Sequence, residues 1–273
     1  MEKILYKYYS PNALGENQIG TLVNKQFWFG GNSIQNDPYD LLGANNFVNS
    51  YVGSKLASYL NKTNIASKQE IEVFKNQLKQ FVSCSFSRVA TDRLMWAHYS
   101  QSYQGFCIAY SFDKESDLQP VVYKDQYPMV KIYPEKKEIE IEGVDIQISE
   151  CLEQWMMTRD PKVLFELIKL LVSIKSQEWV YEQEERIVEI LEDGNGANFS
   201  WEKYGAQPRY LIFGTKFNHK AYSNHVLSLL NIWNFRQSQL LEVATQSLQH
   251  FDISIKQLNS STMSKYYHAL PKY

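Results

Sequence analysis

The passage from Phe81 to Phe112 constrains the fold more strongly than any other part of the sequence. Phe81–Ser87 alternates its side chains in the manner of a strand, and Gly105–Phe112 is a second, strongly apolar strand. Between them, Thr91–Ser100 has the residue types of a short helix. A strand, a helix and a strand in succession predict a sheet with helices packed on it, so we expect the α+β class.

The rest of the chain adds strands and helices, without internal repeats or low-complexity segments. The segment between Pro120 and Gly143 contains prolines and a charged run. We interpret it as a solvent-exposed excursion of the chain and assign it no function. We expect one domain over residues 1–273, with helical insertions at about 41–80 and 145–178. The other predicted strands are 3–9, 26–30, 121–123, 186–191, 210–213 and 251–255. The other predicted helices are a short one that follows the stop at 10–12 and ends at Val23, two within 41–81 broken at 61–67, and 148–157, 162–179, 222–232 and 240–248.

Charge and cysteine content limit the partners. Lysine and arginine total 28 against 30 acidic residues, so the chain has no basic surplus with which to wrap a nucleic acid, although a local basic groove remains open. Cys84, Cys107 and Cys151 are odd in number and widely spaced, which predicts buried thiols rather than disulfides or a zinc site. Without a signal-peptide pattern or a run of about 18 apolar residues, we expect a cytoplasmic protein that makes no membrane contact.

Glu182 and Glu184 are the strongest candidates for chemistry. If their segment is extended, the spacing of two sends both side chains, and that of Arg186, to one face of a strand. Two adjacent carboxylates repel each other, so one pKa rises unless a cation compensates. The alternative is a solvated acidic turn. The aromatic residues Trp179 and Tyr181 just before, and the β-rich run just after, favour a functional site.

Two further segments offer polar or aromatic side chains. The hydroxyls of Ser83, Ser85 and Ser87 share one face of a predicted strand, and we interpret them as orienting groups because the Gly-x-Ser-x-Gly elbow is absent. A strand whose serines simply face the solvent would show the same sequence pattern. The segment Met95–Tyr99 places Trp96, His98 and Tyr99 on a helix, where a lone histidine is more often a hydrogen-bonded core residue than a base.

A metal site is a rival interpretation. Asn36-Asp37-Pro38-Tyr39-Asp40 is a turn, and its two aspartates could gather with Glu182 and Glu184 as oxygen ligands for magnesium in a nuclease. No lysine stands two residues after a carboxylate in the strand context that such nucleases have. We therefore expect no metal ion in the site.

The order of these motifs resembles the bacterial domain-of-unknown-function family 2971, which occurs in many prokaryotes and sometimes beside phage-defence genes. The resemblance covers nearly the whole chain and conveys no activity. Its carriers are Lys7-Tyr8, Asn36-Asp37-Pro38-Tyr39, Ser85-Phe86-Ser87, Met95-Trp96-Ala97-His98-Tyr99, Gly105-Phe106-Cys107-Ile108, Lys175 and Trp179–Arg186.

A more distant resemblance is to ADP-ribosyltransferases of the arginine-serine-glutamate kind, through the basic strand with Lys7, the strand Ser85-Phe86-Ser87 and the pair Glu182-Gln183-Glu184. It implies a split, bent, mixed or antiparallel sheet that binds NAD, and ADP-ribose transfer to an unknown protein or nucleic-acid acceptor, in phage defence or as a toxin. The chain departs from that class at Lys7, where the class has arginine, and at Phe86, where it has threonine. A long stretch with two helices also separates Phe112 from Glu182.

The same resemblance implies a role for each candidate. Glu184 would stabilise the charge on the ribose of NAD, and Glu182 would position or activate the acceptor. Tyr99 or Trp96 would stack on nicotinamide. The remaining candidates for substrate binding are Lys7, Tyr8, Asn36, Asp37, Ser85, Ser87, His98 and Arg186. Besides the magnesium-dependent nuclease, a non-catalytic sensor or partner-binding module remains an alternative, in which Glu182–Arg186 forms an internal ion-pair network.

Overall fold

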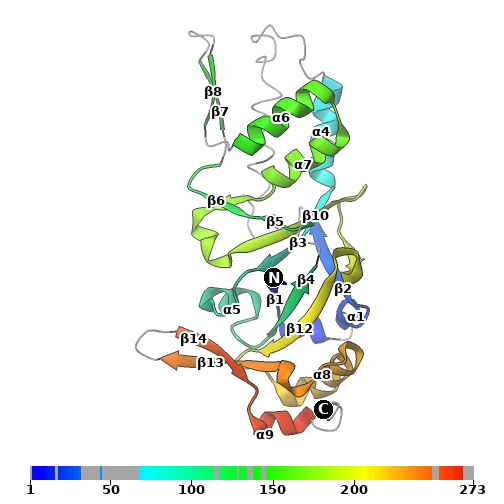
Figure 1. Ribbon diagram of the computed structural model, residues 1–273, viewed down its shortest axis with the longest axis vertical. Helices are drawn as coiled ribbons and strands as arrows, with labels where there is room; N and C mark the ends of the chain where they lie inside the picture. Colours follow the sequence, from blue (N-terminus) through cyan, green and yellow to red (C-terminus); the bar gives the residue numbers. More distant parts are fainter. Residues whose placement is uncertain are drawn as a thin grey trace.

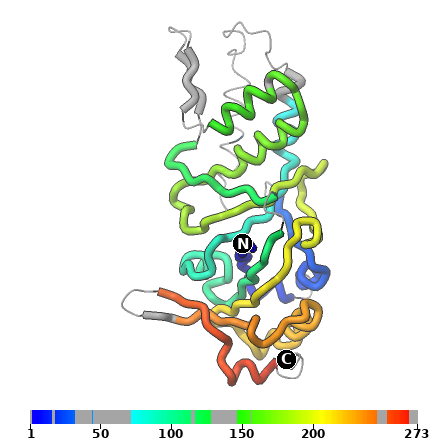
Figure 2. Tube along the Cα trace, in the orientation of Figure 1, coloured from blue at the N-terminus to red at the C-terminus, as the bar shows by residue number. Residues whose placement is uncertain are grey.

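The computed structural model describes residues 2–15, 18–31, 44, 68–113, 117–127, 129–133, 138–142, 146–247 and 252–266. Within these ranges the chain is an α+β protein whose central sheet is mixed and strongly curved (Figure 1). The helices α4, α6 and α7 gather at one end of the elongated molecule, and α8 and α9 lie at the other (Figures 1 and 2). None of the helices in these ranges is both long and apolar enough to cross a membrane.

The described strands are β1 (Lys3–Tyr9), β2 (Gln26–Gly31), β3 (Phe81–Ser87), β4 (Phe106–Phe112), β5 (Gln119–Pro120), β6 (Val122–Lys124), β7 (Met129–Tyr133), β8 (Glu138–Glu142), β9 (Ile174–Ser176), β10 (Glu184–Ile190), β11 (Ala197–Ser200), β12 (Ala206–Phe213), β13 (Leu240–Ser247) and β14 (Asp252–Gln257). The described helices are α1 (Ile19–Val23), α4 (Lys68–Gln80), α5 (Arg93–Tyr99), α6 (Ile146–Thr158), α7 (Pro161–Leu171), α8 (His219–Trp233) and α9 (Ser260–Met263). Short 3₁₀ helices are η1 (Pro11–Leu14), η4 (Gln177–Glu182), η5 (Trp201–Tyr204), η6 (Gln237–Gln239) and η7 (Ser264–Tyr266).

The sheet is split beside β3. Strand β10 pairs with one edge of β3 over its whole length, from Phe81 to Ser87. The other edge is shared by two strands: β2 pairs with it at Val82 and Ser83, and β1 pairs with it only at Ser87. On its far side, β1 pairs with β4 along its entire length. Strands β1 and β2 therefore diverge beside the middle of β3, which confirms the predicted split sheet.

Three apolar clusters of described residues hold this sheet. The larger apolar cluster contains side chains of β2, β3, β4 and α8, and a second one joins α4, α6 and α7 to one face of β3 and β10. A small third cluster packs Trp96 against β4, β12 and β13. Helix α7 shows how its sequence produces this packing. Its N-cap residue Asp160 accepts a 2.8 Å hydrogen bond from the Lys162 amide, and Pro161 occupies the first turn, where its missing N–H is harmless. Its buried residues recur at spacings of three and four, so one stripe of the helix faces the core.

Four predicted elements differ from the structure. In its described part, the helix predicted to end at Val23 consists of the 3₁₀ helix η1 and the short helix α1. Residues 240–248 do not form a helix, because Leu240–Ser247 is strand β13, which pairs in parallel with β12 and antiparallel with β14. The helix predicted over 162–179 ends at Leu171 and is followed by β9, which pairs in parallel with β6. The segment between Pro120 and Gly143 contains β7 and β8, which are close in sequence and pair with each other in antiparallel fashion. For β9 and β13, a strand partner distant in sequence decides the local conformation.

Gly105 provides a test of how closely the strands approach. It precedes β4, and a Cβ atom on it would lie 1.9 Å from the carbonyl oxygen of Tyr9 in β1. Gly105→Ala should lower the free energy of unfolding by about 1–3 kcal/mol, because neither backbone segment can retreat without disturbing the sheet. Urea denaturation measures this change.

Gly20→Ala is the matched control for this prediction. Gly20 lies inside α1, and a Cβ atom there would meet nothing within 4 Å. Its replacement should raise stability by about 0.5–1 kcal/mol through the better helix propensity of alanine. Equal effects of the two substitutions would contradict the close approach at Gly105.

Candidate functional site

A cavity of about 260 Å³ lies where β1 and β2 diverge beside β3. Its lining residues come from β1, β2, β3, α5, β9, η4 and β10, so segments from much of the chain meet there. One part is charged, with Lys175, Glu182, Glu184 and Arg186, and another is aromatic, with Tyr8 and Trp28 among others. The cavity therefore combines a cluster of charged side chains with aromatic side chains in its lining.

The register of β3 and β10 orients the central residues. Glu184 lies opposite Ser87 and Arg186 lies opposite Ser85, so their side chains leave on the same face of the sheet. Glu185 leaves on the other face, where the Lys3 ammonium lies 2.6 Å and the Arg88 guanidinium 2.7 Å from its carboxylate. Alternation along β10 thus separates two ion-pair groups that are adjacent in sequence.

Glu182 reaches the cavity by a different route from the one predicted. It ends the 3₁₀ helix η4, and the next residue, Gln183, is in the left-handed region with φ of +43°. Glu182 and Glu184 therefore do not project from one face of a single strand, and that expectation was wrong. A turn still brings the two carboxylates together, because both lie within ion-pair distance of one ammonium group.

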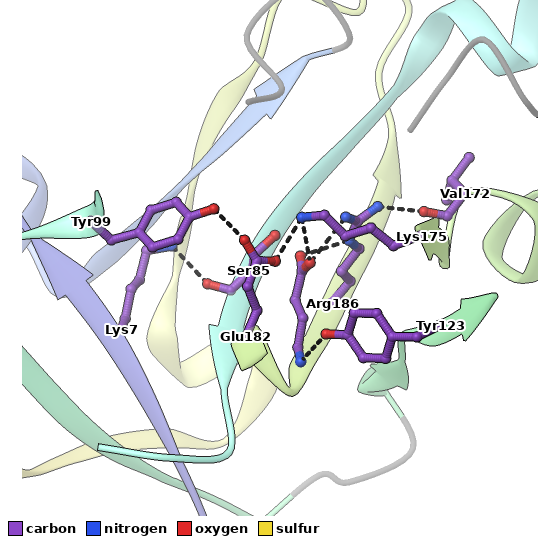
Figure 3. A network of polar contacts seen from close by, with 9 residues as sticks. Lys7, Ser85, Tyr99, Tyr123, Val172, Lys175, Glu182 and Arg186 are labelled. Atoms are coloured by element: carbon purple, nitrogen blue, oxygen red, sulfur yellow. Dashed lines mark hydrogen bonds and ion pairs between the residues drawn. The ribbon is translucent and has the colours of Figure 1, made fainter. Parts of the chain in front are cut away.

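Lys175 and Arg186 neutralise the two carboxylates (Figure 3). Arg186 contacts both oxygens of Glu184, with Nε 2.7 Å from Oε1 and an Nη atom 3.1 Å from Oε2, and its other Nη donates to the carbonyl of Val172. The Lys175 ammonium lies 2.6 Å from Glu182 and 3.3 Å from Glu184. All four charged side chains are buried. Because two cations contact two anions, their attraction offsets the free-energy cost of removing these four charges from water.

The pKa values of the two glutamates shift in opposite directions. Burial by itself would raise the pKa of Glu184, but the charges of Arg186 and Lys175, with a hydrogen bond from Ser85, hold it well below its usual range. Burial raises the pKa of Glu182, and Lys175 opposes this only in part. Of the two carboxyl groups, Glu182 is therefore the one that is more easily protonated.

Helix α5 holds Tyr99 against Glu182. Its N-cap residue Asp92 accepts hydrogen bonds from the amides of Leu94 at 2.7 Å and Met95 at 3.0 Å. The indole of Trp96 is fully buried and donates a 2.7 Å hydrogen bond to the carbonyl of Ala90. On the helix thus anchored, the hydroxyl of Tyr99 donates to the Glu182 carboxylate (Figure 3).

Lys7 bridges the split in the sheet. Its ammonium donates a 3.0 Å hydrogen bond to the carbonyl of Ser85, across the space where β1 and β3 no longer pair (Figure 3). The neighbouring residues Tyr8 and Ser87 both hydrogen-bond to the backbone of Val89, at 2.8 Å and 3.1 Å. These contacts order the chain that leaves β3 toward α5.

The structure brings most of the candidate residues together. Trp96 and His98 are not among the lining residues: Trp96 packs edge-on against Tyr8, with ring centroids 5.1 Å apart, and the exposed His98 lies beside Tyr181. Asn36, Asp37 and Asp40 lie outside the described residues. The candidates that line the cavity are Lys7, Tyr8, Ser85, Ser87, Tyr99, Glu182, Glu184 and Arg186.

Sequence reasoning missed three contributors. Lys175 completes the charge balance, and the repulsion between two neighbouring glutamates was a signal that a second cation was required. The hydroxyl of Tyr123 in β6 accepts a 2.8 Å hydrogen bond from the amide of Glu184, for which there was no signal in the sequence. Trp28 stands in an aromatic strand where alternation alone could not distinguish a lining residue from a surface one.

Among the residues that the structure describes, no three His, Cys, Asp or Glu side chains are grouped so that they could hold a metal ion. The described carboxylates of the cavity are instead held by Lys175 and Arg186. Lysine and arginine donors compete directly for the oxygen atoms that a divalent cation would need.

Residues 95–187 match the model of a family described as "Protein of unknown function (DUF2971)". The matched region contains most of α5 and of β10, together with Lys175, Glu182 and Glu184. The resemblance expected over nearly the whole chain is thus found for this region, and Lys7 and Ser85 lie outside it. No match was found among curated proteins or among solved structures. The similarity to ADP-ribosyltransferases stays a prediction.

Proposed function

We propose that the cavity binds NAD and that the chain transfers ADP-ribose to a macromolecular acceptor or to water. The observation that carries this proposal is the juxtaposition of three strands: β1 with Lys7, β3 with Ser85 and Ser87, and β10 with Glu184, arranged around a split in the sheet. Directed at a phage or host macromolecule, such an activity would serve in defence or as a toxin.

The residues present fit part of such a substrate. Lys7 offers a cation for a diphosphate, Ser85 and Ser87 lie at the cavity beside it, and Tyr99 and Trp28 offer aromatic surfaces. The volume of about 260 Å³ is slightly below the range of ligand cavities, which is roughly 300–1,000 Å³. We therefore assign the cavity to one half of the dinucleotide, with the other half outside it.

Glu182 is the better candidate for the reacting carboxylate. Release of nicotinamide from NAD leaves positive charge on a ribose carbon, and a carboxylate held in advance beside that carbon stabilises it. Both oxygens of Glu184 are already bound by Arg186, whereas Glu182 is held by single contacts from Tyr99 and Lys175. The roles first expected are thus changed: Glu182 faces the ribose, and Glu184 fixes Arg186 and Lys175 behind it.

The full pairing of Glu184, Arg186 and Lys175 favours one alternative, a non-catalytic module in which the network is purely structural. It predicts a stable protein that neither binds NAD nor releases nicotinamide. The metal-dependent nuclease rests on Asp37 and Asp40, which lie outside the described residues.

The test is to incubate the purified chain with NAD labelled on the nicotinamide, with and without a chelator, and separately with mixed nucleic acids and magnesium. We expect release of labelled nicotinamide that the chelator does not change. Absence of both NAD binding and nicotinamide release would overturn the proposal, and chelator-sensitive cleavage of nucleic acid would establish the nuclease in its place.

A further inference from the structure

Trp28 is an exposed aromatic side chain on the wall of the cavity. Its neighbours in β2, Phe27 and Phe29, are fully buried in the larger apolar cluster, so alternation sends Trp28 to the opposite face of the strand. Trp28 is 45% exposed, although tryptophan has the largest side chain of the standard amino acids. A tryptophan left open to water at a cavity wall has a surface available to a ligand.

The pairing of β2 with β3 places Trp28 on the functional face. Gly30 pairs with Ser83, and because side chains alternate along both strands, Trp28 lies on the same face as Ser83 and Ser85. Gly30 also lines the cavity and has no side chain to fill the space beside Trp28. The ring therefore borders open volume on the face that carries Ser85.

Gly196 supports the ring from behind. Its φ is +96°, and a Cβ atom on it would lie 2.9 Å from Cζ2 and 3.3 Å from Cη2 of Trp28. The missing side chain lets the indole pack against this backbone, next to the pairing of Trp28 with Asn198 in β11. Trp28 is thus held in place before any ligand arrives, which lowers the entropy cost of stacking on it.

We propose that Trp28 is the stacking platform for a planar heterocycle of the substrate. This inference rests on the proposed function and deepens it by naming a residue that determines specificity. Stacking on an aromatic side chain is tolerant of ring type, so both nicotinamide and adenine have the required chemistry. In NAD only one of them occupies the platform, since the cavity holds about half of the molecule.

The experiment measures dissociation constants by calorimetry for the wild type, Trp28→Ala and Trp28→Phe. Tyr210→Ala is the control, because Tyr210 is 42% exposed and is not among the residues that line the cavity. The probes are NAD, ADP-ribose, which lacks nicotinamide, and nicotinamide mononucleotide, which lacks adenine. We expect Trp28→Ala to bind NAD about tenfold more weakly, and Trp28→Phe to retain most of the affinity.

The outcomes separate the inference from the function on which it rests. A tenfold loss shared by NAD and only one of the shorter probes supports the platform and identifies its ring. If the wild type binds NAD and Trp28→Ala binds it as tightly as Tyr210→Ala does, the platform is overturned while the proposed function stands. If the wild type binds none of the three probes, both are overturned.

Discussion

Arg186→Met is expected to lower the free energy of unfolding by about 3–5 kcal/mol. The substitution keeps most of the side-chain volume and removes the group that contacts both oxygens of Glu184. Among the cations described beside it, Glu184 would then keep Lys175 alone, at 3.3 Å, and the Lys175 ammonium already lies 2.6 Å from Glu182. Urea denaturation at neutral pH, where both glutamates of the unfolded chain are ionised, measures the loss.

Two further variants make this prediction specific. Lys256→Met removes an ion pair of 3.4 Å with Glu242, in which Lys256 is 57% exposed, and should cost no more than about 1 kcal/mol. The double variant Glu184→Met/Arg186→Met leaves Lys175 paired with Glu182, and it should recover part of the stability lost in the single variant. An Arg186→Met protein as stable as Lys256→Met would contradict the buried network.

Glu182→Gln is expected to slow nicotinamide release about 100-fold to 1,000-fold, the usual effect of removing one group held in advance beside developing charge. Glutamine keeps the size of the side chain and can still accept from Tyr99, so the affinity for NAD should change little. Steady-state kinetics should show the loss in kcat rather than in KM. Because burial raises the pKa of Glu182, the wild-type rate should increase with pH as this carboxyl group ionises, and the variant should lack that increase.

Glu178→Gln is the matched control, since Glu178 belongs to the same 3₁₀ helix and is exposed. It should leave kcat unchanged. A full loss of activity in Glu184→Gln, with a normal rate in Glu182→Gln at equal folded fractions, would reverse the roles assigned to the two glutamates.

The elements predicted correctly are those whose local pattern agrees with their final environment. Strand β4 is buried along its whole length and is apolar almost throughout, so no other element suited it. Leu240–Ser247 was wrongly predicted as a helix because its apolar spacing is compatible with one, and its pairing with β12 and β14 makes it a strand. Such an edge is assembled from residues far away in the chain, which no local pattern contains.

Polar residues that line the cavity could be recognised in the sequence where they stand in an apolar context, as at Ser85 and Glu184. How the two glutamates are placed relative to each other was harder to predict. Spacing alone suggested a shared strand for Glu182 and Glu184, whereas a left-handed residue at Gln183 provides a turn that only the assembled structure reveals. Lys175 was named only as part of the family motif and not as a site residue, because its strand, β9, was taken for the end of a helix.

The position of Lys175 has a consequence for how this chain could be shortened. The residue follows α7 directly, and β6, which pairs with β9, supplies Tyr123 beneath Glu184. The helical insertion is therefore not an autonomous appendage that could be removed without affecting the rest of the fold. A chain shortened between β5 and η4 would lose Lys175 and keep Glu182 and Glu184, with Arg186 as the remaining cation among those described beside them, so the insertion and the central sheet are expected to be inherited together.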